Sequence, residues 1–237
     1  MKRKLPFIII LAVLAVALGS AWYLTRPDPG ARTLSNNPPS TAQRSSTTPG
    51  QPVAPRGIPG AEPAHTLGAA NAPVHLEEFG DYQCPPCSMF HPIVEQMHKE
   101  FGDRLRITFR HFPLPNHAHA VAAASSSEAA GLQGKFWEMH DLIYEHQADW
   151  KDKLDVRPIF EGYAKQIGLD IERWKRDVVS ERIAQRVFLD SRRGQSLGVK
   201  GTPTVFLNGR EVPFESLFQS ENMRAVIQNA LNATGRR

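Results

Sequence analysis

The residues best suited to chemistry are two cysteines, Cys84 and Cys87, which are the only cysteines in the 237-residue chain. Pro85 and Pro86 separate them. A structural disulfide stabilises a fold mainly by closing a long loop, and a bridge between these positions would close almost none. Zinc usually takes four ligands, so a metal site would need histidines from elsewhere or a second chain. The spacing therefore favours a pair of thiols that is reversibly oxidised and reduced.

The two thiols stand at the expected start of a helix. Apolar side chains recur at helical spacing before Gly102, at Met89, Phe90, Ile93, Val94, Met97 and Phe101. The free N–H groups and the dipole of a first helical turn stabilise a thiolate, which is the form that attacks disulfides. We expect Cys84 to be the exposed nucleophile. Cys87, one turn later, is expected to be less accessible and to attack Cys84 when a bound substrate is released.

An acidic residue, Glu78, precedes the thiols on an expected strand over residues 73–79. Alternation places Glu78 on the same face as Val74 and Leu76, which should point into the core beneath the helix. A buried carboxylate is costly unless it has a partner or a task. A surface position remains the alternative if the strand bulges.

The remaining pattern predicts a small α/β sheet with a helical block inserted into it. A second strand is expected over residues 104–110, parallel to the first. The block at about 116–193 contains expected helices at 117–130, 136–144, 159–167 and 171–188. Two short extended runs then flank Asn208-Gly209, a dipeptide suited to a hairpin turn, and Pro213 marks the second run as an edge strand or its end. An amphipathic helix ends the domain.

Three motifs together resemble the DsbA/BdbD-type thiol-disulfide oxidoreductases. They are "EEFGDYQCPPC", "RHFPLPNHAHA" and "GTPTVFLNG", in the order of that family and with a helical block between the second and the third. The resemblance covers about residues 64–234 and implies a thioredoxin fold with an inserted helical domain. The dipeptide Pro85-Pro86 departs from the Pro-His of the strongly oxidising members and from the Gly-Pro of thioredoxin.

The resemblance also implies roles for particular residues. Glu78 lies where thioredoxin-like proteins carry a buried acid, and would transfer protons for Cys87. Thr202-Pro203 would be a cis bond facing the cysteines, with the Thr202 backbone pairing with an extended substrate peptide. Beyond the redox-active disulfide Cys84–Cys87, no cofactor or metal is expected.

The N-terminus is typical of an export signal. Lys2, Arg3 and Lys4 precede residues 5–24, which carry no charge and are long enough to span a membrane. We expect an uncleaved anchor in the cytoplasmic membrane, with a cleaved signal peptide as the alternative. Residues 25–63 are rich in Pro, Ser, Thr and Gly and predict a disordered linker. The domain that follows would be periplasmic or otherwise extracytoplasmic.

The charge distribution argues against a nucleic-acid partner. The net charge of +4 comes from the ends of the chain, since residues 63–235 hold 19 Lys and Arg against 22 Asp and Glu. The histidines, including His117, His119 and His140, are expected on helix surfaces or at the core edge.

The leading interpretation is an exported enzyme that donates disulfides to unfolded or partly folded proteins. It would need a membrane redox partner to reoxidise or reduce the pair. A reductase or isomerase, and a thioredoxin-like module whose thiols hold copper, are the alternatives.

Overall fold

The computed structural model describes residues 57–235, which contain a five-stranded sheet. The order across the sheet is β1-β3-β2-β4-β5, with β2 and β3 parallel and the other neighbours antiparallel. The strands are β1 (His65–Leu67), β2 (Val74–Gly80), β3 (Leu105–His111), β4 (Thr204–Leu207) and β5 (Arg210–Glu211). The parallel pair joined through a helix confirms the predicted strand-helix-strand unit.

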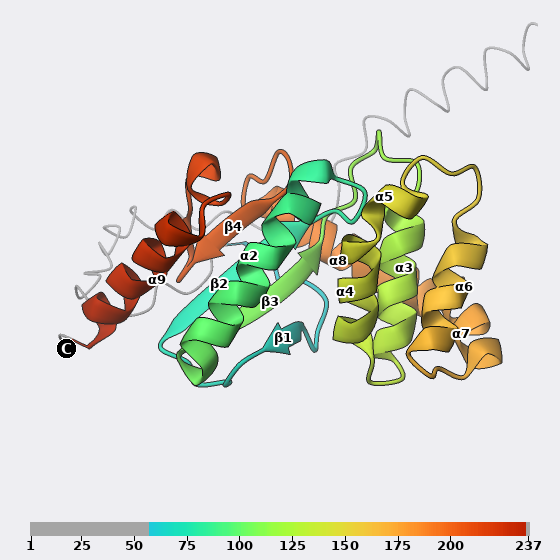
Figure 1. The fold of residues 1–237 in the computed structure, drawn as a ribbon, viewed down its shortest axis with the longest axis horizontal. Coiled ribbons are helices and arrows are strands. Elements are labelled where there is room, and N and C mark those ends of the chain that lie inside the picture. The colour runs from blue at the N-terminus through green and yellow to red at the C-terminus, as the bar shows by residue number, and fades with distance from the viewer. Residues whose placement is uncertain (1–56, 236–237) are drawn as a thin grey trace, which may run out of the picture. The chain divides into compact units, whose positions relative to one another are not determined.

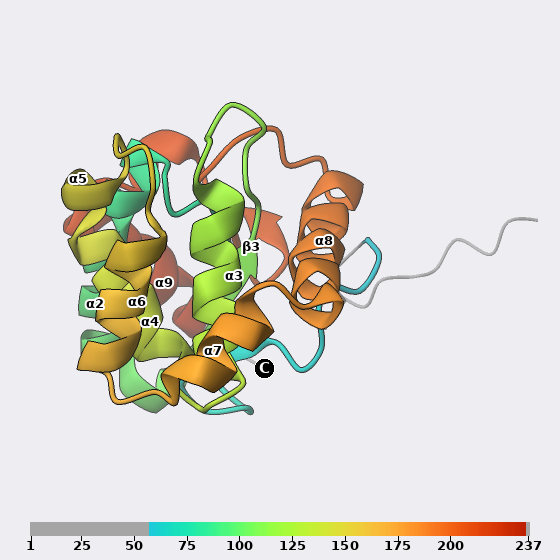
Figure 2. The same cartoon turned by 90° about the vertical axis from the view of Figure 1, so that its right-hand side faces the viewer.

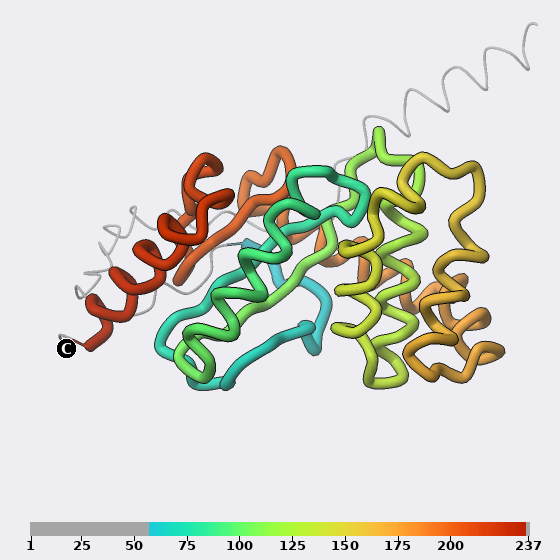
Figure 3. The backbone as a smooth tube through the Cα atoms, viewed as in Figure 1, coloured from blue at the N-terminus to red at the C-terminus, as the bar shows by residue number. Residues whose placement is uncertain are grey.

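Helices cover both faces of the sheet. Helices α2 (Pro85–Phe101) and α9 (Ser220–Thr234) lie on one face, and α8 (Glu181–Ser196) lies on the other (Figures 1 and 2). The smaller helices of the inserted block are α3 (Ala120–Gly131), α4 (Phe136–Glu145), α5 (Gln147–Trp150), α6 (Arg157–Gln166) and α7 (Ile171–Val178). They gather at one end of the sheet, and the backbone trace can be followed there in Figure 3. Short 3-10 helices occupy Gly102–Arg104 and Phe214–Ser216.

Strand β2 sends alternate side chains to the two faces of the sheet, as its sequence predicts. Val74 and Leu76 are completely buried in a core that they share with Phe90 of α2. Phe79 points to the opposite face and belongs to a separate cluster with Phe206. This alternation directs the side chain of Glu78 toward α2.

Glu77, on the other face of β2, anchors α8 to the sheet. Its carboxylate accepts hydrogen bonds from Arg193 of α8 at 2.7 and 2.8 Å, and from Arg110 of β3 at 3.1 Å. Arg110 also donates to Asp190 of α8 at 3.0 Å. Buried charges are tolerated when each is paired in this way. The cluster fixes α8, and the chain leaves α8 to enter the segment before β4.

The hairpin turn predicted at Asn208-Gly209 is confirmed. Asn208 and Gly209 have φ values of 49° and 77°, the left-handed conformation that a two-residue turn of this kind requires. The second strand, β5, is the edge strand, and Pro213 follows its end. The missing N–H of Pro213 therefore disturbs no ladder.

Three features differ from the sequence expectation. The helix expected over 171–188 is two helices, because Ser180 caps α8 by accepting a hydrogen bond from the Ile183 amide. Strand β1 was not predicted. Residues 57–63, expected to be linker, belong to the folded unit: Ala61 is buried, and its amide donates to Asp190 at 2.8 Å.

The expected membrane segment, 5–24, and the linker up to residue 56 lie outside the described residues. Among residues 57–235, no helix is both long enough and apolar enough to cross a membrane.

Candidate active site

Helix α2 begins at the two cysteines. Cys84 is the N-cap residue, with extended backbone, and Pro85 and Pro86 occupy the first turn. Proline suits these positions because their N–H groups would have no partner within the helix. The Cys84 amide donates to the Asp81 carbonyl at 3.1 Å, and the Cys87 amide donates to the Cys84 carbonyl at 3.1 Å. The local backbone thus holds both sulfurs at the start of the helix.

Cys84 is less exposed than predicted. Its relative exposure is 5%, and that of Cys87 is 0%. The reason lies in distant segments: the Cys84 Sγ lies 3.3 Å from the Thr202 carbonyl oxygen, and the Gln147 side chain donates to the Cys84 carbonyl at 3.0 Å. Cys84 remains the more accessible of the two thiols, in the predicted order.

The two thiols have opposite acidities. A hydrogen bond from the Cys87 side chain, together with the Thr202 hydroxyl and the Cys87 N–H, lowers the pKa of Cys84 from 9.0 to about 6 despite burial. Burial, and then the proximity of Cys84, raises the pKa of Cys87 well above its ordinary value. At neutral pH the negative charge therefore resides on Cys84, while Cys87 keeps its proton.

Glu78 of β2 is buried in the interior of the protein. Its relative exposure is 4%, and it lies opposite Phe109 of β3 and Val205 of β4 in the register of the sheet. Burial raises its pKa from 4.5 to about 8. When ionised, Glu78 raises the pKa of Cys87, so its field reaches that sulfur. The alternative surface position for Glu78 does not occur, because β2 continues without a bulge through its pairing with β3.

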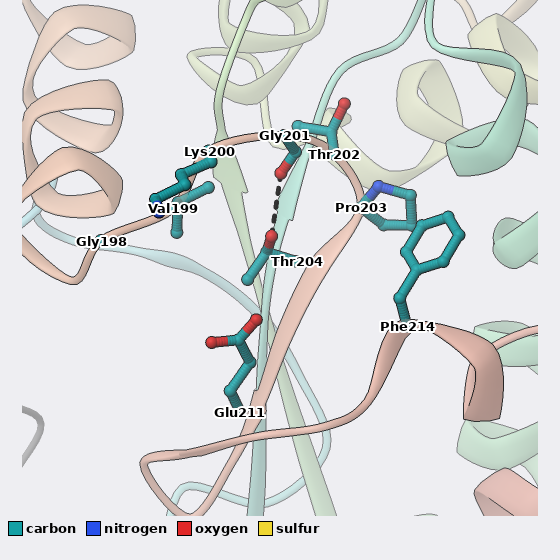
Figure 4. Close-up of a pocket in the computed structure, with 9 residues that line it drawn as sticks. All are labelled: Gly198, Val199, Lys200, Gly201, Thr202, Pro203, Thr204, Glu211 and Phe214. Carbon is teal, nitrogen blue, oxygen red and sulfur yellow. Dashed lines mark hydrogen bonds between the residues drawn. The ribbon is translucent and has the colours of Figure 1, made fainter.

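The Thr202–Pro203 peptide bond is cis, as the resemblance implied, and the Thr202 carbonyl lies against Cys84. The residues from Gly198 to Thr204 line an open depression of about 410 Å³ together with Glu211 and Phe214. Figure 4 shows the Phe214 ring beside that of Pro203. The Thr202 hydroxyl is buried and has no hydrogen-bond partner among the described residues, and it contributes to lowering the pKa of Cys84.

Replacing Thr202 with valine should raise the pKa of Cys84, because valine keeps the branched shape and removes the hydroxyl that stabilises the thiolate. The rate of Cys84 alkylation at about pH 6 should fall severalfold, and the rate at about pH 9 should change little. Thr204→Val is the matched control, because the Thr204 hydroxyl donates instead to the Gly201 carbonyl at 2.8 Å. Equal alkylation profiles for the wild type and Thr202→Val would contradict this assignment.

Two residues that support the site were not singled out from the sequence. The Asp81 carboxylate accepts hydrogen bonds from the amides of Gln83 and Leu114, both at 2.8 Å, and so fixes the turn before Cys84. Its place in the "GDY" turn is a signal that could have identified it. Gln147 of α5 also donates to the Tyr82 carbonyl at 2.6 Å. Nothing in the local sequence indicates that this glutamine reaches the active site.

The histidines are mostly structural, and one expectation for them was wrong. His117 contacts Asp81 at 2.7 Å, and His119 contacts the Lys153 carbonyl at 2.6 Å. His140 was expected at the surface or core edge, but it is 4% exposed and lies 3.0 Å from the Tyr82 hydroxyl. Burial among aromatic rings explains the difference. Within residues 57–235, the three groupings of potential metal ligands include neither cysteine.

Comparison with known proteins agrees with this geometry. The model of the family described as "Thioredoxin" matches residues 61–229, more than two thirds of the chain. The chain belongs to the thioredoxin family. Within that family its structure is DsbA-like, which confirms the predicted thioredoxin fold with a helical insertion.

Solved structures of DsbA-like proteins superpose on this thioredoxin-family chain. Oxidised BdbD from Bacillus subtilis gives a TM-score of 0.65 at 26% identity, covering 76% of this chain and 98% of that one. The structure of α-DsbA1 from Wolbachia pipientis gives a TM-score of 0.63 at 18% identity, covering 76% and 96%. At the lower identity, the likeness concerns the fold.

Curated relatives that match part of this chain bear a different name. A Na(+)/H(+) antiporter NhaA 1 of Salinispora arenicola is 37% identical over 172 residues, which make up 72% of this chain and 25% of that protein. Its counterpart in Mycolicibacterium vanbaalenii is 40% identical over 150 residues, 61% of this chain and 23% of that protein. The thioredoxin-family chain thus spans about a quarter of the length of these relatives, and the shared part is too short to carry their name over.

Proposed function

We propose that this chain is a thiol-disulfide oxidoreductase that donates the Cys84–Cys87 disulfide to thiol-containing proteins outside the cytoplasm. The observation that carries the proposal is the opposite acidity of the two sulfurs: the pKa of Cys84 is lowered to about 6, and that of Cys87 is raised by burial. Stabilising one thiolate favours the reduced state of the pair, so the disulfide becomes a better oxidant. The proposal also draws on the family match and the likeness to BdbD.

In the first step a substrate thiolate attacks the Cys84 sulfur of the disulfide. The bond between Cys84 and Cys87 breaks, and a bond between the substrate sulfur and Cys84 forms. The Cys87 sulfur leaves with the electron pair and needs a proton, because its thiolate is buried. Glu78, whose pKa of about 8 keeps it largely protonated at neutral pH, supplies that proton.

In the second step another substrate thiolate attacks the substrate sulfur of the mixed disulfide. The substrate disulfide forms, and Cys84 departs as the thiolate that its surroundings stabilise. The reduced pair, with a thiolate at Cys84 and a thiol at Cys87, must then pass two electrons to an oxidant and lose the proton of Cys87. A membrane-bound redox partner is the proposed oxidant, consistent with an anchor at residues 5–24 that would hold the domain near the membrane.

The substrate is proposed to lie along the Thr202–Pro203 segment. The Thr202 carbonyl lies next to the Cys84 sulfur. Thr202 also lines the depression of about 410 Å³, together with Pro203 and Phe214. An extended peptide could pair with this backbone, so binding would depend little on substrate sequence. Such tolerance suits an enzyme acting on many unfolded proteins.

Oxidative refolding tests the proposed direction of exchange. The oxidised chain should accelerate disulfide formation in a reduced, unfolded protein, at a rate proportional to enzyme concentration and with one disulfide formed per enzyme molecule when no oxidant is added. A chain that reduces disulfides but does not form them would refute the proposal.

A further inference from the structure

A second group of side chains with ligand chemistry lies between α2 and α4, separate from the thiols. His91 comes from α2, and His140 and Asp141 come from α4; one ligand atom of each lies within 4.8 Å of those of the other two. His91 forms a second grouping of the same size with Glu95 and Glu145. The five residues are called the α2/α4 cluster below. Two imidazoles and three carboxylates thus converge on one helix interface.

The ring of His91 is held in place with its Nε2 atom unused. The side chain is 5% exposed, and Nε2 has no hydrogen-bond partner among residues 57–235. The nearest carboxylate oxygen, on Asp141, lies 3.7 Å away, beyond hydrogen-bonding distance. Stacking on Tyr144, with ring centroids 5.2 Å apart, fixes the orientation of the ring. Buried polar atoms are nearly always paired, so this nitrogen lacks the partner that its position requires.

His140 has the support that metal-binding histidines usually have. Its Nδ1 lies 3.0 Å from the Tyr82 hydroxyl. If Nδ1 donates its proton to that hydroxyl, Nε2 keeps its lone pair and can serve as a ligand. A hydrogen bond from the other ring nitrogen is the common way in which proteins orient a ligating histidine.

Charge separates this cluster from the other buried grouping of similar composition. In the grouping of His111, Glu128 and Asp190, arginines already neutralise the acids: Arg186 contacts Glu128 at 2.6 Å, and Arg110 contacts Asp190 at 3.0 Å. Among the described residues, no arginine or lysine forms an ion pair with Asp141, whose ion pairs are limited to His91. Lys99 contacts Glu95 of the α2/α4 cluster at 3.7 Å, but the three residues His91, His140 and Asp141 have no such cation paired with them in the described part of the chain.

We propose that His91, His140 and Asp141 bind a Zn²⁺ ion, with water completing the coordination. Two imidazole nitrogens and a carboxylate are a common zinc ligand set, whereas calcium and magnesium prefer oxygen ligands alone. Asp141 is 39% exposed, so it gives the ion a path from solvent. His91 lies one helical turn after Cys87, and the ion would clamp the active-site helix to the inserted helical block. This site involves no thiol and is independent of the proposed exchange function.

Calorimetric titration of the full chain with Zn²⁺ tests the proposal. The chain should carry no histidine tag and should have its Cys84–Cys87 disulfide formed, so that the thiols cannot hold the metal. We expect one ion per chain, and a weakening of at least about 100-fold in His91→Gln and in Asp141→Asn. Asp141→Asn changes a half-exposed residue and guards against misfolding of the buried variant. His98→Gln, on the same helix but outside the cluster, is the control and should bind as the wild type does.

Two further readouts decide whether the ion occupies the proposed place. X-ray absorption at the zinc edge should show nitrogen and oxygen ligands without sulfur. Zinc should raise the melting temperature of the wild type and of His98→Gln but not that of Asp141→Asn, because only a folded site binds the ion. The absence of saturable binding, unchanged affinity in both cluster variants, an equal loss in His98→Gln, or sulfur ligation would each overturn the proposal.

Discussion

The Cys84→Ser variant is expected to lose disulfide donation by more than about a thousandfold, because a serine oxygen cannot form the mixed disulfide on which exchange depends. Cys87→Ala should also fail to turn over, but for a different reason. Cys84 can still bond to a substrate sulfur in that variant, and no second thiol remains to release it. The two variants should therefore be equally inactive in oxidative refolding. Only Cys87→Ala should accumulate mixed disulfides with substrate proteins.

Non-reducing gels of the purified variants distinguish these outcomes. Cys87→Ala should carry substrate proteins that are released by a reductant, and Cys84→Ser should carry almost none. We expect this difference because Cys84 has a relative exposure of 5% and Cys87 of 0%, so a substrate can reach only Cys84. Circular dichroism should confirm that both variants fold. Equal trapping by the two variants would contradict the assignment of Cys84 as the attacked sulfur.

The Glu78→Gln variant is expected to donate disulfides about 10- to 100-fold more slowly at pH 7, since an amide keeps the shape of the acid but cannot give a proton to Cys87. Stopped-flow rates should be corrected for the fraction of substrate thiolate. The corrected wild-type rate should fall as pH rises through about 8, where Glu78 ionises. The corrected rate of the variant should not show this fall.

Glu100→Gln provides a matched control, because the same chemical change is made on an exposed glutamate that pairs with Arg224. Its rate and pH profile should equal those of the wild type. A pH profile of Glu78→Gln that coincides with the wild-type profile would contradict proton transfer by Glu78.

Glu78 should also make the stability of the fold depend on pH. Its folded pKa of about 8 lies above the value of 4.5 expected in the unfolded chain, so the folded state binds more protons between these two values. The free energy of unfolding should decrease as pH rises through that window, by several kcal/mol at about 1.4 kcal/mol per pH unit. The wild type loses this stability and the variant does not, so the melting temperature of Glu78→Gln relative to that of the wild type should rise as the pH increases from about 4.5 to about 8.

The parts of the site that follow from local patterns could be predicted from the sequence. The apolar spacing after Cys87 sets the active-site helix, and Gly102 follows its last residue. The alternation of β2 puts Glu78 on the same face as Val74 and Leu76, because β3 pairs with β2 along its whole length without a bulge. The Asn208-Gly209 turn is specified by the conformations that these two residues tolerate.

The contacts that tune the thiols could not be predicted in this way. Thr202 lies 118 positions from Cys84 in the sequence, and Gln147 lies 63 positions away. Their approach depends on how the inserted block and α8 pack against the sheet. The burial of Cys84 follows from these distant contacts, which is why the local pattern predicted an exposed thiol. Strand β1 has three residues, too few for alternation to identify.

The reduction potential of the pair is the most direct test of disulfide donation. Thioredoxin combines a cysteine pKa of about 7 with a potential of about −270 mV, and DsbA combines about 3.5 with about −120 mV. The Cys84 pKa of about 6 lies between these values. Interpolation gives roughly −230 mV, an intermediate potential milder than that of the strongest oxidants.

Equilibration of the chain with glutathione buffers, followed by alkylation and mass spectrometry, measures this potential. A value clearly above that of thioredoxin, near −230 mV, is the result expected for a mild disulfide donor with a stabilised Cys84 thiolate. A value at or below about −270 mV would contradict donation and would identify the pair as a reductant.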